Sequence, residues 1–217
     1  MPLVGFFDIL GTREAVMSDR FSDIEALEFV NAIGLAARFS PTIRFAVFSD
    51  SLIVSAEATE IRPALRALNF MYGNWFSELV YVRGAISYGD IRWIDDSATD
   101  DLFRKRPNLT YARVYGKGLV TAHELEQKSG PGAICFLTDS AAELFRTAEP
   151  NSVLYGHTPM LCWATKQQAE GFKGYARNQL ARTEKDSVEW RHANATKHFW
   201  SLVVASEKFL PATYAIQ

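Results

Sequence analysis

The sequence FFDILGT at Phe6–Thr12 places a carboxylate, Asp8, at the end of a short apolar run that begins at Leu3. An apolar run that is followed by a turn with glycine indicates a buried strand. Further along, the sequence FSDSL at Phe48–Leu52 joins two more apolar runs, and it predicts a tight hairpin with Asp50 at its tip. Two carboxylates therefore abut hydrophobic strands, inside which Asp is normally depleted.

The pair Asp8 and Asp50 admits two interpretations. Together they can hold Mg²⁺ or Mn²⁺, because hard cations take oxygen ligands and Mg²⁺ typically uses one or two carboxylates plus substrate phosphates. Separately, Asp8 can cap a helix and Asp50 can form a turn, and both roles are common. The spacing alone favours the two structural roles, so a metal site needs support from other motifs.

The composition is that of an ordinary globular chain. Its 217 residues, 48% of them apolar and 22% charged, suit one domain or one domain with an added element. A net charge of −2 gives no indication of bulk electrostatic binding to nucleic acid or to an acidic membrane. Cys135 and Cys162 lie in apolar segments without metal-ligand spacing, which indicates buried thiols in a reducing cytoplasm. We expect no signal peptide and no membrane span, since no apolar run approaches roughly 20 residues.

The order of the predicted elements favours an α/β fold with a partly antiparallel sheet. The elements are a strand at 3–7, a helix from a capping box at 22–25 to about 37, the Asp50 hairpin, a helix over 62–79, a strand over 81–88, a helix opened by Gly116-Lys117-Gly118 and ending at 126, a strand at 133–137, a short helix capped by Thr138, and last strands at 153–154 and 160–163. We expect these elements to form one domain over residues 1–165.

Residues 166–217 are predicted to form a helical extension packed on or beside that domain. The stretch 175–209 has neither Pro nor Gly and carries a recurring apolar face, so it predicts one long helix. His192 and His198 are spaced so that they do not share a helical face, and we expect no metal site from them. His123 and His157 are isolated and are interpreted as structural.

Four motifs, in order, resemble the class III nucleotide cyclase catalytic domain. They are Phe-x-Asp-Ile-x-Gly around Asp8, the hairpin carboxylate Asp50, VRGAISYG at Val82–Gly89, and VYGKGLVTAHELE at Val114–Glu126. The resemblance implies a ferredoxin-like core with a mostly antiparallel sheet, and a homodimer with its sites at the interface. It also implies two metal ions and a triphosphate. The metal ligands would be Asp8, Asp50 and the Ile9 carbonyl, and the phosphate-binding backbone N–H groups would be those of Leu10, Gly11 and Thr12.

The sequence departs from the adenylyl cyclase pattern at the residues that read the base. The adenine-reading Lys and Asp of that pattern fall on Ala46 and Arg113. Arg113 offers donors and no acceptor, so it suits a carbonyl of uracil, or O2 and N3 of cytosine, better than the adenine amino group. The ribose-orienting Asn and the transition-state Arg fall on Val120 and Glu124, which cannot replace them. The candidates for base or ribose contact and for the missing cation are Arg83, Arg113, Tyr115 and Lys117.

This combination resembles the compact bacterial cyclases of the Pycsar antiphage systems, which keep the Asp pair in a Phe-x-Asp-Ile-Leu-Gly and Ser-Asp-Ser setting. The resemblance implies a pyrimidine nucleotide cyclase, with UTP as first choice and CTP as second. Its cyclic UMP or cyclic CMP would activate a separate effector protein. The alternatives are a purine (adenylate or guanylate) cyclase, a catalytically inactive nucleotide-binding regulatory module, and a polymerase-like or diguanylate-cyclase-like palm. The sequence lacks the Gly-Gly-Asp/Glu-Glu-Phe hairpin of diguanylate cyclases.

Overall fold

The computed structural model describes residues 1–19, 22–94 and 114–214. Its centre is a seven-stranded sheet in which neighbouring strands are antiparallel, except for the parallel pair β4 and β7. The order across the sheet is β2 (Arg44–Phe48), β3 (Ser51–Glu57), β1 (Pro2–Ile9), β4 (Val82–Tyr88), β7 (Cys135–Leu137), β9 (Met160–Leu161) and β8 (Val153–Leu154). A small second sheet pairs β5 (Arg92–Trp93) with β6 (Val114–Tyr115). The predicted mixed α/β fold with a mostly antiparallel sheet is confirmed.

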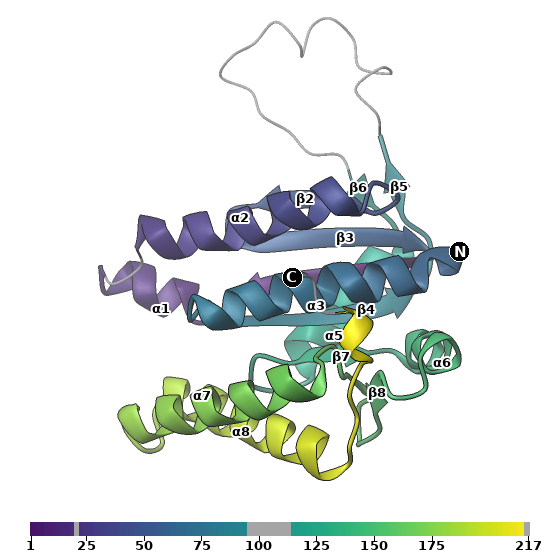
Figure 1. Ribbon diagram of the computed structural model, residues 1–217. Coiled ribbons are helices and arrows are strands. Elements are labelled where there is room, and N and C mark those ends of the chain that lie inside the picture. Colours follow the sequence, from purple (N-terminus) through teal and green to yellow (C-terminus); the bar gives the residue numbers. More distant parts are fainter. Residues whose placement is uncertain (20–21, 95–113, 215–217) are drawn as a thin grey trace, which may run out of the picture.

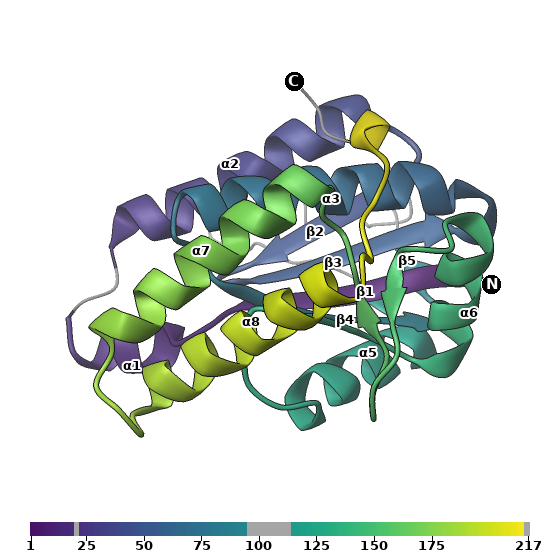
Figure 2. The same ribbon diagram turned by 60° about the horizontal axis from the view of Figure 1, so that its bottom comes forward.

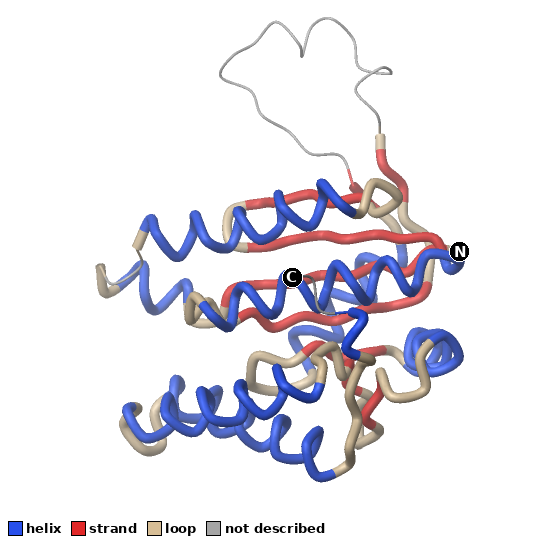
Figure 3. Tube along the Cα trace, viewed as in Figure 1, coloured by secondary structure: helices blue, strands red, loops and turns tan. Residues whose placement is uncertain are grey.

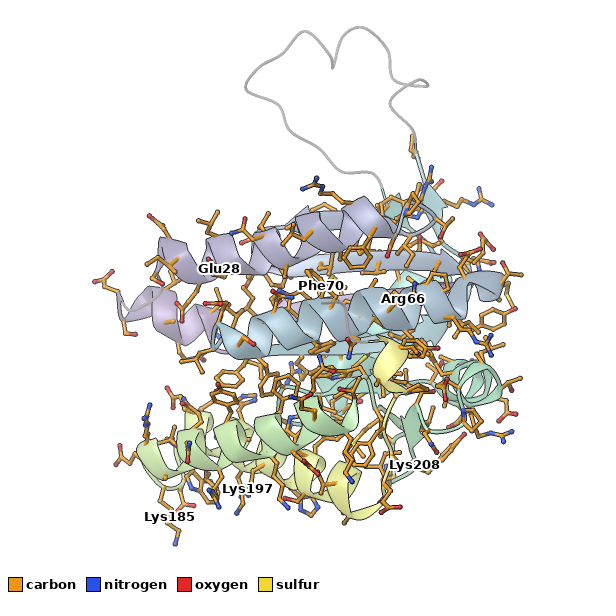
Figure 4. The ribbon with its side chains drawn as sticks, viewed as in Figure 1. Glu28, Arg66, Phe70, Lys185, Lys197 and Lys208 are labelled. Carbon is orange, nitrogen blue, oxygen red and sulfur yellow. The ribbon has the colours of Figure 1, made fainter. Side chains whose placement is uncertain are left out.

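Helices cover both faces of the main sheet (Figure 1, Figure 3). The helices α2 (Asp23–Phe39) and α3 (Ile61–Ser77) lie on one face, and α5 (Lys117–Lys128) lies on the other (Figure 2). The shorter elements are α1 (Thr12–Met17), η1 (Ala58–Glu60), α6 (Asp139–Ala148) and η3 (Ala212–Tyr214). Between α2 and α3, Phe70 meets the ring of Phe39 edge-on (Figure 4). No helix in the described ranges combines the length and the apolar character needed to cross a membrane.

Local signals set the start of α2 and the turn between β2 and β3. The hydroxyl of Ser22 accepts from the Glu25 N–H at 3.2 Å, and the Glu25 carboxylate accepts from the Ser22 N–H at 3.1 Å, which confirms the predicted capping box. The predicted hairpin is also present, with only Ser49 and Asp50 between its strands. Ser49 has φ 54°, the left-handed conformation that tight hairpin turns require.

A close contact between Phe7 and Gly84 fixes how β1 lies against β4. The two residues are partners in the antiparallel register, and a Cβ at Gly84 would lie 2.2 Å from Cδ1 of the Phe7 ring. Only glycine therefore fits beneath this buried ring. The same register places Asp8 opposite Arg83 on β4 and opposite Ser51 on β3. The packing of an aromatic residue thus determines which side chains gather at this end of the sheet.

The C-terminal segment forms two helices, α7 (Lys166–Arg182) and α8 (Val188–Ala205), where the sequence predicted one long helix. The helices lie side by side and are joined by a short turn (Figure 1, Figure 2). Asp186 takes a left-handed φ of 69° in this turn, and the hydroxyl of Ser187 caps α8 by accepting from the Trp190 N–H at 3.0 Å. Lys185 and Lys197 project away from the sheet (Figure 4). We call α7 and α8 the C-terminal hairpin.

An aromatic cluster joins the C-terminal hairpin to the rest of the molecule. Trp163 follows β9, and its ring packs against Phe172 of α7 at 5.2 Å and against Trp200 of α8 at 5.0 Å, measured between ring centroids. Phe76 of α3 contacts both Phe172 and Trp200. Trp163 and Trp200 are fully buried. Burial of such large rings is a strong apolar driving force, so it holds the C-terminal hairpin against α3 and the sheet edge.

Candidate active site

The structure brings Asp8 and Asp50 to the same end of neighbouring strands. Asp8 lies near the carboxyl end of β1, and Asp50 lies in the turn directly before β3. The strands are locked together here, because the Ile9 N–H donates to the Asp50 carbonyl at 3.1 Å. The Ser51 hydroxyl donates to Oδ1 of Asp8 at 2.6 Å. The two carboxylates predicted to act as a pair are therefore neighbours in space.

A groove of about 230 Å³ opens at this end of the sheet, and we call it the Asp8 groove. It is lined by Asp8, Ile9, Leu10, Gly11, Thr12, Arg13, Glu14, Asp50, Arg83 and His192. The chain turns sharply after β1, with Gly11 at φ 81°. Ordered peptide N–H groups at such a turn can bind anions.

One predicted phosphate contact does not agree with the hydrogen bonding of this turn. The Leu10 N–H donates to the Tyr81 carbonyl at 2.8 Å, so it is already occupied within the fold. The Ile9 N–H is likewise used by the Asp50 carbonyl. Among the described residues, no backbone acceptor is recorded for the N–H groups of Gly11 and Thr12. Any amide contact to an anion in the Asp8 groove therefore shifts from Leu10 to these two residues.

Arg83 supplies positive charge beside the carboxylates, and a buried acid holds it in place. Its Nε donates to Oε1 of Glu126 at 2.5 Å, and its Nη1 donates to the Gly130 carbonyl at 3.2 Å. Glu126 comes from α5 and is only 2% exposed. The sequence did not indicate Glu126 as a site residue, although it is the last residue of the fourth motif. Because this pair is largely out of water, its geometry fixes the guanidinium next to Asp8.

Tyr115 and Lys117 lie at the opposite end of the sheet from the Asp8 groove. The first turn of α5 sits beside the start of β1 and the end of β4, because the Gly118 N–H donates to the Asp90 carbonyl at 2.9 Å and the Ser87 hydroxyl donates to the Gly118 carbonyl at 2.7 Å. With a rise of about 3.3 Å per residue along β1, roughly 20 Å separates this region from Asp8. Arg113, the predicted base contact, lies outside the described residues.

Tyr115 lines a second cavity of about 630 Å³ at that opposite end. Its side chain is 51% exposed, and Lys117 is also exposed. The guanidinium of Arg44 lies 5.6 Å from the ring centroid of Trp93 in the same cavity, a cation–π distance. One chain therefore carries two separated sets of candidate residues rather than one complete set.

Comparisons with known proteins identify the fold. No family model matches the sequence, and no curated protein matches it. Among solved structures, a bacterial light-regulated adenylyl cyclase aligns with TM-score 0.51 and 14% identity over 66% of this chain and 44% of that chain. The guanylyl cyclase Cya2 aligns with TM-score 0.50 and 11% identity over 74% of this chain and 90% of that chain. The chain has a nucleotide cyclase fold. At these identities the likeness shows the fold alone, and the chain spans less than half of the light-regulated enzyme.

Within this cyclase fold, the protonation of Asp8 bears on metal binding. Burial is the main reason that the pKa of Asp8 is raised to about 6. The hydrogen bond from Ser51 lowers the pKa, and the negative charge of Asp50 raises it. Glu126 raises the pKa further, and Arg83 lowers it. The ionised form of Asp8 is therefore short of compensating positive charge. A hard cation bound by Asp8 and Asp50 would supply that charge, so this donor set fits Mg²⁺ or Mn²⁺.

The ligands available in the chain are few. The described residues contain no group of three or more His, Cys, Asp or Glu side chains that could hold a metal ion. The Ile9 carbonyl, the third predicted ligand, accepts from the Thr12 hydroxyl at 3.1 Å and keeps a second lone pair. A cation here would thus have two carboxylates, one carbonyl and oxygens from water or substrate, the pattern that Mg²⁺ prefers.

His192 is a residue of the Asp8 groove that the sequence did not predict. It lies in α8, and the C-terminal hairpin carries it to the groove that also contains Asp8, Asp50 and Arg83. No sequence signal pointed to this, because the spacing between His192 and His198 bore only on a metal site and argued against one. Its place in the groove depends on how the hairpin folds back.

Proposed function

We propose that the chain is a nucleotide cyclase, which converts a nucleoside triphosphate to the 3′,5′-cyclic monophosphate and pyrophosphate. The observation that carries the proposal is the convergence of Asp8, Asp50, Arg83 and the turn amides of Gly11 and Thr12 around one groove. Carboxylates for a cation, a guanidinium and free N–H donors are what a triphosphate with its metal ions requires. The shared fold of adenylyl and guanylyl cyclases supports this reading.

The reaction joins the ribose 3′-oxygen to the α-phosphorus, releases the 3′-hydroxyl proton to water, and breaks the bond from that phosphorus to the bridging oxygen of pyrophosphate. Asp8 and Asp50 would hold two Mg²⁺ or Mn²⁺ ions, with Ile9 contributing its carbonyl. When bound, these ions neutralise the triphosphate and lower the pKa of the 3′-hydroxyl. The N–H groups of Gly11 and Thr12 donate to phosphate oxygens. The protein's own contribution is to position the two reacting atoms and to balance charge.

Arg83 is the described residue best placed to compensate charge on the phosphates. The Glu126 carboxylate and the Gly130 carbonyl orient its guanidinium, so little side-chain entropy is lost when it meets an anion. It is opposite Asp8 in the sheet, and it lines the Asp8 groove. We therefore assign to Arg83 the charge-compensating role for which the sequence left three candidate cations, Arg83, Arg113 and Lys117.

We further propose that the enzyme acts as a homodimer with each site shared between two copies. Tyr115 and Lys117 are exposed at the end of the sheet opposite Asp8 and cannot reach the Asp8 groove of their own chain. An antiparallel pair of chains would place them against the groove of the other copy. Mixing Asp8→Asn protein with Lys117→Ala protein tests this, because a mixed dimer would contain one intact site. Recovery of activity on mixing two inactive variants supports shared sites, and no recovery contradicts them.

For the substrate we propose a pyrimidine triphosphate, UTP before CTP, with cyclic UMP acting on a separate effector in antiphage defence. Support comes from Ala46, which stands in β2 where adenylyl cyclases carry a base-reading Lys, and from the donor-only character of Arg113. A purine cyclase is the second candidate, since the solved structures with this fold include adenylyl and guanylyl cyclases. Val120 and Glu124, in the places of catalytic residues, favour a third, an inactive nucleotide-binding module.

The test is to incubate purified protein with Mn²⁺ and each of the four ribonucleoside triphosphates, and to resolve the products by mass spectrometry. If wild type forms a cyclic pyrimidine monophosphate and the Asp50→Asn variant does not, both the proposed reaction and the proposed base specificity are supported. A cyclic purine product would keep the reaction and overturn the base assignment. Tight triphosphate binding without product from any of the four would favour the regulatory module.

A further inference from the structure

The C-terminal hairpin is seated on the turn before β7 by specific hydrogen bonds. Nδ1 of His192 accepts from the Gly132 N–H at 3.0 Å, and Oγ1 of Thr196 accepts from the Ala133 N–H at 2.9 Å. Gly132 has φ 109°, and a Cβ there would lie 3.1 Å from Cβ of Ala195. The backbone of this turn thus approaches α8 closely, and its hydrogen bond to Nδ1 holds that edge of the His192 ring in place.

The bond from Gly132 also determines which nitrogen of His192 carries a proton. Because Nδ1 accepts a hydrogen bond, it is unprotonated, and the neutral ring carries its hydrogen on Nε2. Burial lowers the pKa of His192, and Arg83 and Arg191 lower it further; the carboxylates of Glu14 and Glu189 raise it by less, so the pKa lies below its usual value. Within the described residues, Nε2 has no recorded hydrogen-bond partner. The Gly132 bond therefore orients a donor for which the described residues provide no acceptor.

The same turn serves both His192 and Arg83. The Gly130 carbonyl accepts from Nη1 of Arg83, and the Gly132 N–H donates to His192 two residues later. Both side chains line the Asp8 groove, and His192 also lines an adjoining cavity of about 110 Å³ between the C-terminal hairpin and the turn after β1. Arg83 donates to Glu126 and to the Gly130 carbonyl, whereas no residue in the described part of the chain accepts a hydrogen bond from Nε2 of His192. One short turn thus contacts two donor side chains that line the same groove.

We propose that the Nε2 hydrogen of His192 donates to a β- or γ-phosphate oxygen of the triphosphate in the Asp8 groove, so that the C-terminal hairpin completes the phosphate site. The inference rests on the proposed function for the identity of the substrate. It makes the hairpin a working part of the site, because the donor reaches the groove only while α8 remains seated on the Gly132 turn. The competing explanation is that His192 serves only to attach α8.

Two substitutions separate these explanations. His192→Asn places an amide oxygen near the position of Nδ1, so it retains the acceptor for Gly132 and loses the Nε2 donor. His192→Gln places an amide nitrogen near the position of Nε2, so it retains the donor and loses the acceptor. His198→Asn is the matched control, since His198 is exposed on the same helix and lies outside the lining of the groove.

The primary measurement is calorimetric binding of tripolyphosphate in the presence of Mg²⁺, with kcat and KM for the triphosphate as the second. Hydrogen bonds to charged groups are worth enough to predict a loss of about 10- to 100-fold in tripolyphosphate affinity for His192→Asn. We expect His192→Gln to retain more affinity than His192→Asn despite a lower Tm, and His198→Asn to match wild type. If His192→Asn binds as wild type does, or if only His192→Gln is impaired, His192 is an attachment residue and the inference is wrong.

The two proposals fail in different ways. Suppose that the wild-type protein makes no cyclic product but that His192→Asn binds tripolyphosphate more weakly than wild type. This result would support the phosphate contact of His192 and contradict the cyclase activity. If His192→Asn forms cyclic product as well as wild type does, the cyclase activity is supported and the phosphate contact of His192 is contradicted. A wild type that binds no tripolyphosphate overturns the inference directly.

Discussion

Substitution of Asp8 by Asn should stabilise the metal-free protein while it removes activity. Asn has nearly the same shape as Asp, and its amide oxygen can still accept from the Ser51 hydroxyl that now donates to Asp8. What it removes is a carboxylate whose pKa rises from 3.8 to about 6, mainly because of burial. In the metal-free protein at neutral pH this charge is unfavourable in the folded state. The residue proposed to be most important for catalysis is thus expected to reduce stability.

The magnitude follows from the pKa. A rise from 3.8 to about 6 corresponds to at most about 3 kcal/mol of unfavourable charge in the folded state. Asp8 is only half-buried, so solvent screening reduces the expected gain from Asp8→Asn to about 1 kcal/mol. For a chain of this length, that gain raises Tm by about 2–4 °C.

The pH dependence has a definite sign. Because the folded pKa is the higher one, the protonated carboxyl contributes stability that is fully present below pH 3.8 and is lost as the pH rises through about 6. The free energy of unfolding of Asp8→Asn should therefore exceed that of wild type by more at pH 7.5 than at pH 5.

The assay is urea unfolding of wild type and Asp8→Asn in chelator at pH 5 and pH 7.5, repeated with millimolar Mn²⁺. Because a ligand stabilises the state that binds it, Mn²⁺ should raise the stability of wild type and have a smaller effect on the variant. An Asp8→Asn protein that is less stable than wild type in chelator at pH 7.5 would refute the electrostatic reasoning. An equal response of both proteins to Mn²⁺ would refute the metal assignment.

Further substitutions test other parts of the site and fold. Asp50→Asn should abolish product formation but change the free energy of unfolding by less than about 1 kcal/mol, because Asp50 lies in a partly exposed turn; a normal product assay would remove it from the site. Arg83→Met should cost about 3–5 kcal/mol in urea unfolding, because it leaves the buried Glu126 carboxylate unpaired, and adding Glu126→Met should recover most of that loss; an Arg83→Met protein as stable as wild type contradicts this. Trp200→Ala should cost about 3–5 kcal/mol and increase hydrogen exchange in α8, whereas unchanged exchange would mean that the aromatic cluster does not hold the hairpin. Arg113→Ala should change the preference among triphosphates more than the dependence on Mn²⁺, and unaltered preference would exclude it from the base pocket.

Features set by local chemistry were predictable from the sequence. The capping box at Ser22, the cap of α6 at Thr138 and the hairpin at Asp50 each depend on residues within a few positions of one another. The pairing of Asp8 with the hairpin also followed, because buried strands that end in polar turns align at the edge of a sheet. That these carboxylates bind metal stays a prediction, as does the domain boundary near residue 165.

The turn within the C-terminal segment could not be predicted from the absence of Pro and Gly. The chain reverses where Asp186 adopts a left-handed conformation without being glycine. The hydroxyl of Ser187 caps α8, but a serine within a helical pattern is weak evidence for a break. Burial of Trp200 against Trp163 stabilises the reversed chain direction. Local helix propensity does not predict such a long-range contact.

Two residues that the sequence did not indicate, Glu126 and His192, are placed by contacts between distant parts of the chain. Glu126 lies 43 positions from Arg83, which the sequence did name as a candidate, and His192 lies 60 positions from Gly132. Neither pair has a periodic or motif signal that links its members. The separation of Lys117 from the Asp8 groove is likewise a matter of strand direction, which the motif order did not reveal.

The central claim is that Asp8 and Asp50 hold the cations on which a triphosphate is cyclised. Anomalous diffraction from crystals grown with Mn²⁺ and a UTP analogue that cannot be cyclised tests it most directly. The account predicts manganese peaks between the two carboxylates, with phosphate oxygens next to Gly11, Thr12 and His192. Manganese bound elsewhere, or a triphosphate bound away from the Asp8 groove, would contradict it.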